Sequence, residues 1–444
     1  MCARFATRAM NDWLNKLPQP SRRAYAFGLL CVVSFALLLR VGVTAVFVGL
    51  NSPPDLEAQP DQEYYEKIAH SLAVGAGYTL SVENPKPTAL VAPGTSLTIL
   101  PMYLIFGRSY LMARLWFCIV SALACLGVAL TVRQLAGRAV ALAAAAVMAV
   151  YPNHFYNAMH FTTETPYVFY MSLALALSVA ALRRQLILLS IAGGCLWGAA
   201  ALTRPQIVLV IPLALVCVLA GWRSESRWML VRTWAIQSAL VALMLLPWLI
   251  RNHVVIGQPV ISTNAGHTLF HSHNELIFND PAYRPYRGTW LPDFDKLKQL
   301  YPIEGTTELE RDRAARQHAL NSIRRNLDKM PALVWAKFLK FIGPVHDSPN
   351  FPVKIAFTLG WSFVGIFSIV GLCLLWKQDP QMAVFIVLPI VATLVTCLLF
   401  HAESRYRDSA SAAFVALAGI GVSWAVAQSF SVVSARLSGT KMKC

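Results

Sequence analysis

Long uninterrupted runs of apolar residues alternate with short polar segments along this chain, and their lengths predict helices that cross a membrane. The hydrocarbon core of a bilayer takes about 20 apolar residues per helix, and a helix satisfies every backbone polar group internally. The pattern therefore predicts an all-α polytopic membrane protein with about ten or more spans. The expected spans cover residues 24–50, 109–132, 138–153, 164–182, 186–202, 205–221, 230–250, 354–376, 381–400 and 409–428.

Two apolar stretches do not fit a single crossing. The run 186–221 is too long and contains Thr203-Arg204-Pro205. Proline removes a helix hydrogen bond and arginine is costly in lipid, so the chain is expected to turn there. Residues 89–107 contain Pro93, Gly94 and Pro101. They are expected to form a juxtamembrane helix at the outer surface, because a crossing would place Arg183 and Arg184 outside.

The placement of charge orients the predicted helices. Hydrophobic residues make up 56% of the 444 residues and charged residues only 14%, with a net charge of +16. The basic residues mark the ends of spans, which argues against a nucleic-acid partner. Short loops rich in Lys and Arg stay cytoplasmic, so the N-terminus is expected inside and the loop after the first span outside.

Three parts of the chain follow from this topology. Residues 1–250 form an N-terminal membrane module that carries the first outer loop, 51–108. Residues 251–353 form a large outer loop, expected to be helical around 308–327 and 331–342, and residues 354–444 supply the last membrane helices. No N-x-S/T sequon occurs, which favours a bacterial inner membrane, with the outer loops in the periplasm.

The first outer loop is unusually acidic. Six of the chain's 22 acidic residues fall between Asp55 and Glu83. If the segment is helical, Asp61, Tyr65 and Ala69 share one face. This spacing is equally compatible with an ordinary solvated amphipathic helix.

The same loop carries a family resemblance. The pattern Asp61-x-x-x-Tyr65-x-x-x-Ala69, followed by Gly75-x-Gly77-Tyr78, resembles the first outer loop of the GT-C glycosyltransferases. It is most similar to the protein mannosyltransferase and aminoarabinose transferase branch. Further segments resemble that family in the same order and on the same side of the membrane: Tyr151-Pro152, Thr163-Glu164, Leu202-Thr203-Arg204-Pro205, Leu246-Pro247-Trp248 with Arg251-Asn252, Asn264-x-Gly266 and Arg405-Tyr406-Arg407.

The resemblance implies a polyprenyl-phosphate-linked sugar donor and transfer, with inversion, to a lipid, polysaccharide or protein acceptor at the outer face. Asp61 is the expected general base, because the attacking acceptor must lose a proton. Asp61-Gln62-Glu63 fits a variant of the family's Asp-x-Asp motif, which adds Glu63, and the family places a second acidic residue at Glu164. The other acids of the loop are expected to be surface charge.

Arginines at the membrane boundary are expected to stabilise the charge on the leaving phosphate. The alternative for each is anchoring by a snorkelling side chain. Two tyrosines and an asparagine complete the substrate-binding set that the resemblance implies. The expected substrate-binding residues are Arg40, Tyr65, Arg204, Arg251, Asn264, Arg405, Tyr406 and Arg407.

Arg40 belongs to this set because an ionisable residue inside a span marks a functional site by default. We expect Asp61 or Glu164 to be its partner. A divalent cation is a further alternative, since His160 and Glu164 could share a helix face. The other outer histidines that raise this alternative are His154, the run His267, His271 and His273, and His401 beside Glu403. No cofactor is assigned from the sequence.

Two other functions remain open. An O-antigen ligase or polymerase also combines many spans with a long outer loop, but it would concentrate basic and histidine residues in the large loop. A carrier of lipid-linked sugars would place ionisable residues near the midplane on several helices. Only Arg40 meets that description, which favours a glycosyltransferase.

Overall fold

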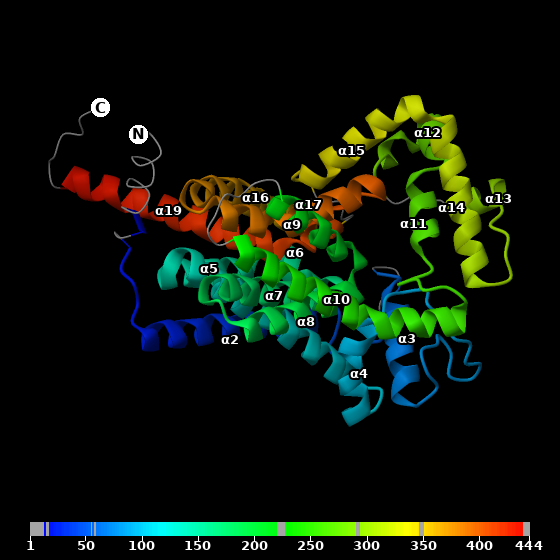
Figure 1. Cartoon of the computed structure of the whole chain (residues 1–444), viewed down its shortest axis with the longest axis horizontal. Coiled ribbons are helices and arrows are strands. Elements are labelled where there is room, and N and C mark those ends of the chain that lie inside the picture. The colour runs from blue at the N-terminus through cyan, green and yellow to red at the C-terminus, as the bar shows by residue number, and fades with distance from the viewer. Residues whose placement is uncertain are drawn as a thin grey trace.

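The computed structural model describes residues 13–14, 17–54, 56, 59–219, 227–289, 294–345 and 350–437. A bundle of long apolar helices forms most of the molecule, and the first of these helices begins at the same end of the bundle where the last of them ends (Figure 1). Seven helices in the described residues are long and apolar enough to cross a membrane, so the predicted all-α polytopic fold is confirmed. They are α2 (Arg22–Phe47), α5 (Tyr110–Val150), α7 (Glu164–Arg184), α10 (Arg227–Ile256), α16 (Phe351–Gln378), α17 (Pro380–Leu399) and α19 (Ser411–Leu437).

Helix α5 supplies two of the expected spans. Its 41 residues are twice what a bilayer requires, and Gly137 breaks it with φ +87°. Arg40 of α2 donates hydrogen bonds both to Ser121 in the first arm (2.7 Å) and to the carbonyl of Ala149 in the second (3.1 Å). The two arms therefore run back alongside each other. This reversal confirms the predicted turn between residues 132 and 138.

The predicted break at Thr203-Arg204-Pro205 is also confirmed. Helix α8 (Ile187–Thr203) ends there, and the short 3-10 helix η1 (Pro205–Leu209) leads into α9 (Val210–Leu219). Arg204 is extended, with φ −137° and ψ 106°. The end of the expected span 205–221 lies outside the described residues.

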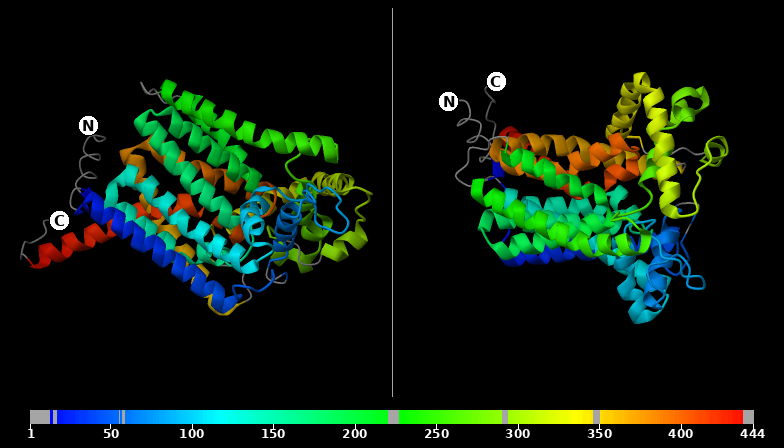
Figure 2. Two further views of the ribbon diagram at one scale, coloured as in Figure 1. Left: turned by 90° about the horizontal axis from the view of Figure 1, so that it is seen from below. Right: turned by 45° about the vertical axis from the view of Figure 1, so that its right-hand side comes forward.

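The segments that follow the first span gather at the end of the bundle away from the termini (Figures 1 and 2). Helix α3 (Gln62–Ala73) packs against α4 (Gly94–Phe106). At 13 residues α4 is too short to cross a bilayer, and Leu104, Ile105 and Phe106 at its end are exposed. This agrees with the expected juxtamembrane helix.

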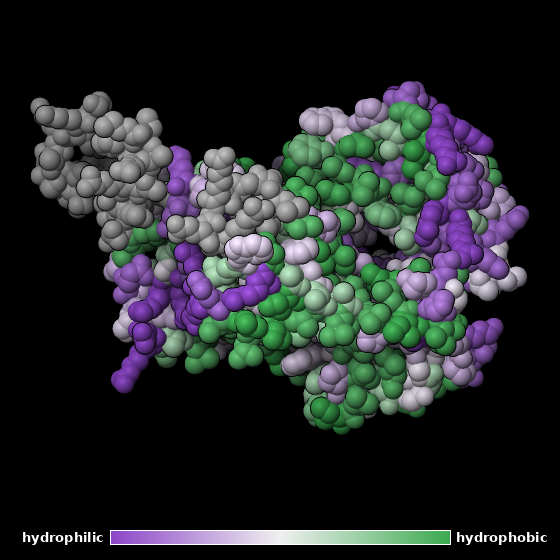
Figure 3. All heavy atoms as spheres, in the orientation of Figure 1, coloured by the Kyte–Doolittle hydropathy of each residue, from purple (hydrophilic) through white to green (hydrophobic). Residues whose placement is uncertain are grey.

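The large outer loop has a small hydrophobic core of its own around Phe270, Ile277 and Ala315. Figure 3 shows hydrophobic residues over the bundle and hydrophilic residues over α14, with a hollow between the two regions. The two helices expected in this loop are confirmed as α14 and α15. The outer elements are α11 (Ala265–Ser272), α12 (Glu275–Asn279), η2 (Pro281–Tyr286), α13 (Phe294–Leu300), α14 (Glu308–Arg325), η3 (Leu327–Lys329) and α15 (Met330–Ile342).

Glu66 corrects an expectation for the acidic loop. Its side chain is buried rather than on the surface and forms two bonds to Arg108, at 2.9 and 2.8 Å. Tyr103 of α4 donates a third bond to it, at 2.9 Å. These contacts fix α3 against α4, and so fix the position of Asp61 at the start of α3.

A close approach at Gly94 joins α4 to the end of α8. A Cβ at Gly94 would lie 2.7 Å from the backbone N and Cα of Thr203, the residue before Arg204. Backbone atoms cannot give way as a flexible side chain can, so any side chain here would displace the α8–η1 break.

We therefore expect Gly94→Ala to destabilise the protein by roughly 1–3 kcal/mol, as overpacking does. Gly42→Ala is the matched control, because nothing lies within 4 Å of a Cβ there. Thermal unfolding of both purified variants in detergent measures the difference. An unfolding midpoint of Gly94→Ala equal to that of Gly42→Ala would contradict the tight packing.

Candidate active site

Glu164 is a buried carboxylate that accepts hydrogen bonds from two arginines. It is the first residue of α7, and its side chain is 1% exposed. Arg204 donates to Oε1 at 2.8 Å, and Arg405 donates to the same oxygen at 2.7 Å. A buried carboxylate is tolerated when its charge is paired in this way. The three residues come from α7, the α8–η1 break and α18 (Ser404–Asp408).

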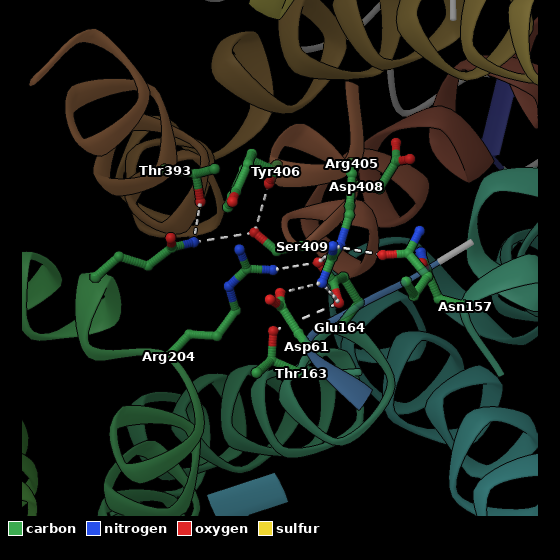
Figure 4. Close-up of polar contacts among 12 residues, drawn as sticks. Asp61, Asn157, Thr163, Glu164, Arg204, Thr393, Arg405, Tyr406, Asp408 and Ser409 are labelled. Carbon is green, nitrogen blue, oxygen red and sulfur yellow. Dashed lines mark hydrogen bonds and ion pairs between the residues drawn. The ribbon is translucent and has the colours of Figure 1, made fainter. Parts of the chain in front are cut away.

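Arg405 connects this buried pair to the acidic outer loop. Its guanidinium contacts Asp61 Oδ2 at 3.4 Å and Gln59 Oε1 at 2.5 Å (Figure 4). Burial alone would lower the pKa of Arg405, but Glu164 and Asp61 raise it well above its ordinary value. Arg405 therefore stays charged and bridges a buried and a more exposed carboxylate.

Asp61 differs from Glu164 in its exposure. Its side chain is 46% exposed, and within the described part of the chain its one ion pair is the 3.4 Å contact with Arg405. Asp61 also precedes α3 in an α-helical conformation and makes no side-chain capping bond. The neighbouring Gln62 fixes this end of α3 by accepting a bond from the Phe161 backbone N–H at 3.1 Å. Asp61 thus presents carboxylate oxygens to solvent from a fixed backbone.

Tyr406 packs beside the arginines. The Arg204 guanidinium lies 5.0 Å from the Tyr406 ring centre, and the His401 ring meets the other side edge-on at 4.5 Å. Burial raises the pKa of Tyr406, so the phenol remains protonated. Gln206, which the sequence did not single out, donates to Ser409 at 3.0 Å and braces η1 against α18.

Tyr65 and Glu63 are placed differently by α3. Tyr65 is buried in the core that α3 shares with α4, and burial raises its pKa. Glu63 pairs with Lys67 on the surface at 2.5 Å, away from Glu164. The structure thus separates the two acids of Asp61-Gln62-Glu63.

Three of the expected substrate-binding residues lie outside the Glu164 cluster. Arg251 bonds the carbonyl of Thr88 at 2.6 Å and holds the first outer loop against α10. Asn264 precedes α11 and accepts a bond from Thr268. Arg407 is fully buried, donates to the carbonyls of Phe341 and Gly343 at the end of α15, and lies 3.9 Å over the Trp361 ring. Their contacts are structural.

The expected pairing of Arg40 with Asp61 or Glu164 is wrong. The Arg40 guanidinium donates to Ser121 and to the carbonyls of Ala36, Met148 and Ala149. The low polarity of the bundle interior makes these backbone acceptors effective partners. Arg40 joins α2 to both arms of α5.

The histidines do not assemble with carboxylates into a larger cluster. His160 precedes α7 and so shares no helix face with Glu164. The Nε2 atom of His273 lies at hydrogen-bond distance, 2.9 Å, from Nζ of Lys337 in α15. Burial lowers the pKa of this lysine to about 7. His154 contacts Ser121 at 3.1 Å. Within the described residues no group of three His, Cys, Asp or Glu side chains could hold a metal ion.

Comparison with known proteins gives a family match for part of the chain and a likeness in fold for most of it. Residues 90–250, which include Glu164 and Arg204, match the family model of dolichyl-phosphate-mannose-protein mannosyltransferases. A search of curated protein sequences gives no match. The chain resembles the oligosaccharyltransferase AglB of Archaeoglobus fulgidus in complex with an inhibitory peptide and a dolichol-phosphate, with TM-score 0.54 and 14% identity over 94% of this chain and 52% of that one.

Two further structures resemble this chain. The apo form of the Archaeoglobus fulgidus enzyme gives TM-score 0.54 and 15% identity, again over 94% of this chain and 52% of that one. ArnT from Cupriavidus metallidurans in the apo state gives TM-score 0.44 and 14% identity over 89% and 77% of the two chains. The chain thus spans about half the length of the archaeal enzyme. The protein mannosyltransferase match over residues 90–250 and the likeness in fold to the archaeal enzyme agree with the family resemblance noted in the sequence.

Asp408, the last residue of α18, makes the stability of the folded chain depend on pH. It accepts bonds from Tyr151 at 3.4 Å and Asn153 at 3.2 Å. Burial raises the pKa of Asp408 from 3.8 to about 6, with Arg407 opposing the shift. The folded chain therefore holds this proton more tightly than the unfolded chain does. This contribution to stability is present below about pH 4 and is lost as the pH rises through 6.

We expect the unfolding midpoint of the wild type to fall between pH 4 and pH 7 by more than that of Asp408→Asn, which cannot ionise. Thermal unfolding in detergent across this range measures the two slopes. Asp379→Asn, at the opposite end of the bundle in an ion pair with the half-exposed Arg183, should keep the wild-type slope. Equal slopes for the wild type and Asp408→Asn would refute the assignment.

Proposed function

We propose that this protein transfers a sugar from a polyprenyl-phosphate donor to an acceptor at the periplasmic face of a bacterial inner membrane, with inversion. The observation that carries the proposal is the Arg405 guanidinium between the half-exposed Asp61 and the buried Glu164. It places a candidate base next to two cations that could receive a phosphate. The protein mannosyltransferase match to residues 90–250 supports the same class of donor.

Asp61 is the proposed general base. A base must reach the acceptor's proton and must have an oxygen available to take it. Asp61 meets both conditions because nearly half of its side chain is exposed, whereas both arginines bond Glu164 and leave it 1% exposed. Glu164 then serves to hold the two arginines in place.

The proposed reaction is a single displacement. The acceptor oxygen bonds to the anomeric carbon while the bond from that carbon to the phosphate oxygen breaks. The electron pair of the broken bond remains on the phosphate, and the acceptor's proton passes to Asp61. Attack opposite the leaving group inverts the anomeric carbon. Arg204 and Arg405 would stabilise the charge that develops on the phosphate.

An apolar crevice that extends from Ile207, near Arg204, toward Leu182 and Gln381 supports a lipid-linked donor. It has a volume of about 80 Å³ and lies between η1–α9, α10 and α17. Ile207, three residues after Arg204, forms part of its wall, and Ile211 and Phe385 line it further along. A phosphate held at Arg204 would therefore place an attached isoprenoid chain at the Ile207 end of this crevice. Such a chain gains free energy by leaving water.

A divalent cation does not fit between the two carboxylates as they stand. Asp61 and Glu164 carry two negative charges, and Arg204 and Arg405 balance them with two positive charges. A cation would have to displace Arg405 from both carboxylates. We therefore propose that the arginines alone stabilise the leaving phosphate.

The base assignment predicts that Asp61→Asn lowers the transfer rate by about 10²-fold or more, the contribution typical of general base catalysis. Binding of a polyprenyl-phosphate sugar should be retained, because the isosteric amide preserves the shape of the site. The control is Glu83→Gln, an exposed acid of the same loop. Transfer by purified protein in detergent, together with donor binding, tests both parts. A normal rate for Asp61→Asn would rule out the base, and failure of the wild type to bind any such donor would rule out the class.

The charge balance predicts that a chelator leaves the wild-type rate within about twofold, whereas Arg405→Ala lowers it by about 10²–10³-fold, as loss of a charge-stabilising donor does. Transfer assayed with and without EDTA tests the first expectation. Activity lost in EDTA and restored by Mg²⁺ or Mn²⁺ would show that a cation takes part. Lys377→Ala, an exposed cation at the other end of the bundle, controls for the change of net charge.

A further inference from the structure

A second cavity lies at the opposite end of the bundle from the Glu164 cluster. It occupies about 1310 Å³ between α2, α5 and the end of α7, more than the roughly 300–1,000 Å³ of ordinary small-molecule sites. Helix α7 starts at Glu164 and ends at Arg184, which lines the cavity. Its 21 residues span about 30 Å, the thickness of a hydrocarbon core. We call this cavity the α2–α5 groove.

The rim of the α2–α5 groove is basic and its walls are apolar. Four arginines line it, and no acidic residue does. Leucine and valine side chains of α2 and α5 form the walls below them. The rim residues are Arg22, Arg133, Arg138 and Arg184, and wall residues include Leu29 and Leu126.

Among the described residues, the groove arginines lack an ion pair of the kind that Arg183 forms at the same end of the bundle. Arg183, next to Arg184, pairs with Asp379 at 2.7 Å. Arg133 instead lies 5.6 Å from the ring centre of Tyr25, and Arg138 donates to the carbonyl of Pro20 at 2.9 Å. In the part of the chain that the structure describes, no carboxylate forms a salt bridge with any of the four. Their positive charge therefore faces the hollow uncompensated.

Residues 1–12 contain two arginines and one aspartate, and residues 438–444 contain two lysines and no acid, so both segments are basic. An anion from outside this sequence would compensate the groove arginines, and the apolar walls favour one that carries hydrocarbon. Basic pockets between membrane helices bind anionic lipid headgroups for the same reason.

We propose that the α2–α5 groove binds an anionic glycerophospholipid, with its phosphate at the four arginines and its acyl chains along the leucine walls. Helix α2 lies at the edge of the bundle (Figure 2), and only 22% of its most apolar stretch is buried. A lipid in the groove would therefore hold α2 against α5. The proposal does not depend on the transfer reaction at the other end.

Native mass spectrometry of the full chain tests the proposal with an equimolar mixture of dioleoyl phosphatidylglycerol and dioleoyl phosphatidylcholine. The wild type should retain phosphatidylglycerol preferentially. Arg133→Gln with Arg184→Gln should weaken this retention by about tenfold, since each basic residue near a lipid surface contributes measurably to binding. Arg23→Gln with Lys377→Gln is the matched control, because it removes two exposed charges at the same end but outside the groove.

Ala26→Trp provides a test that leaves the charge unchanged. Ala26 lines the groove on α2, so the indole should fill it and displace the lipid even if the arginine variant fails to fold. Equal retention of the two lipids by the wild type would show that the groove makes only nonspecific contacts with surrounding lipid, and would overturn the proposal. Equal losses in the groove and control double variants, or unchanged retention by Ala26→Trp, would also overturn the proposal.

Discussion

The ion pairs of Glu164 with Arg204 and Arg405 are the interaction on which the arrangement of this site depends. A carboxylate at 1% exposure is costly unless cations and hydrogen bonds compensate it. Here the two guanidiniums lie at 2.8 and 2.7 Å from one oxygen, and the start of α7 adds the favourable end of a helix dipole. Loss of either arginine would leave the negative charge of Glu164 incompletely balanced. This charge lies where three segments that are far apart in the sequence meet. The cluster therefore holds the outer ends of α7, α8 and α18 together.

Two backbone features allow these side chains to meet. Pro205 cannot continue the hydrogen bonding of α8, so Arg204 is extended and its side chain leaves the helix axis toward α7. Gly94 lets α4 approach the end of α8, and Gln206 bonds to Ser409 on the far side. The arginines are thus fixed by packing before any ligand binds, which is the condition for electrostatic stabilisation of a developing charge.

The sequence could predict what depends on local pattern. Apolar run length predicts the spans, and Pro205 predicts the break, because both act on the backbone where they occur. The family resemblance indicated Asp61, Glu164, Arg204 and Arg405 but not which of them touch. Glu66 could not be distinguished from surface acids, since its burial depends on Arg108 and Tyr103 from other segments. Partners 37 to 344 residues away leave no local signal in one sequence.

The arginines illustrate the same limit and also indicate which residues are available to a ligand. Arg407 is held by carbonyls at the end of α15, and Arg40 by carbonyls and a hydroxyl within the bundle. A phosphate could replace those acceptors only by leaving buried carbonyls without a hydrogen-bond donor. Arg405 is held partly by Asp61, a half-exposed carboxylate at 3.4 Å, and a phosphate oxygen can take its place at no cost to the backbone. The nature of the acceptor, rather than the presence of an arginine at a boundary, therefore separates the arginines proposed to bind phosphate from the structural ones.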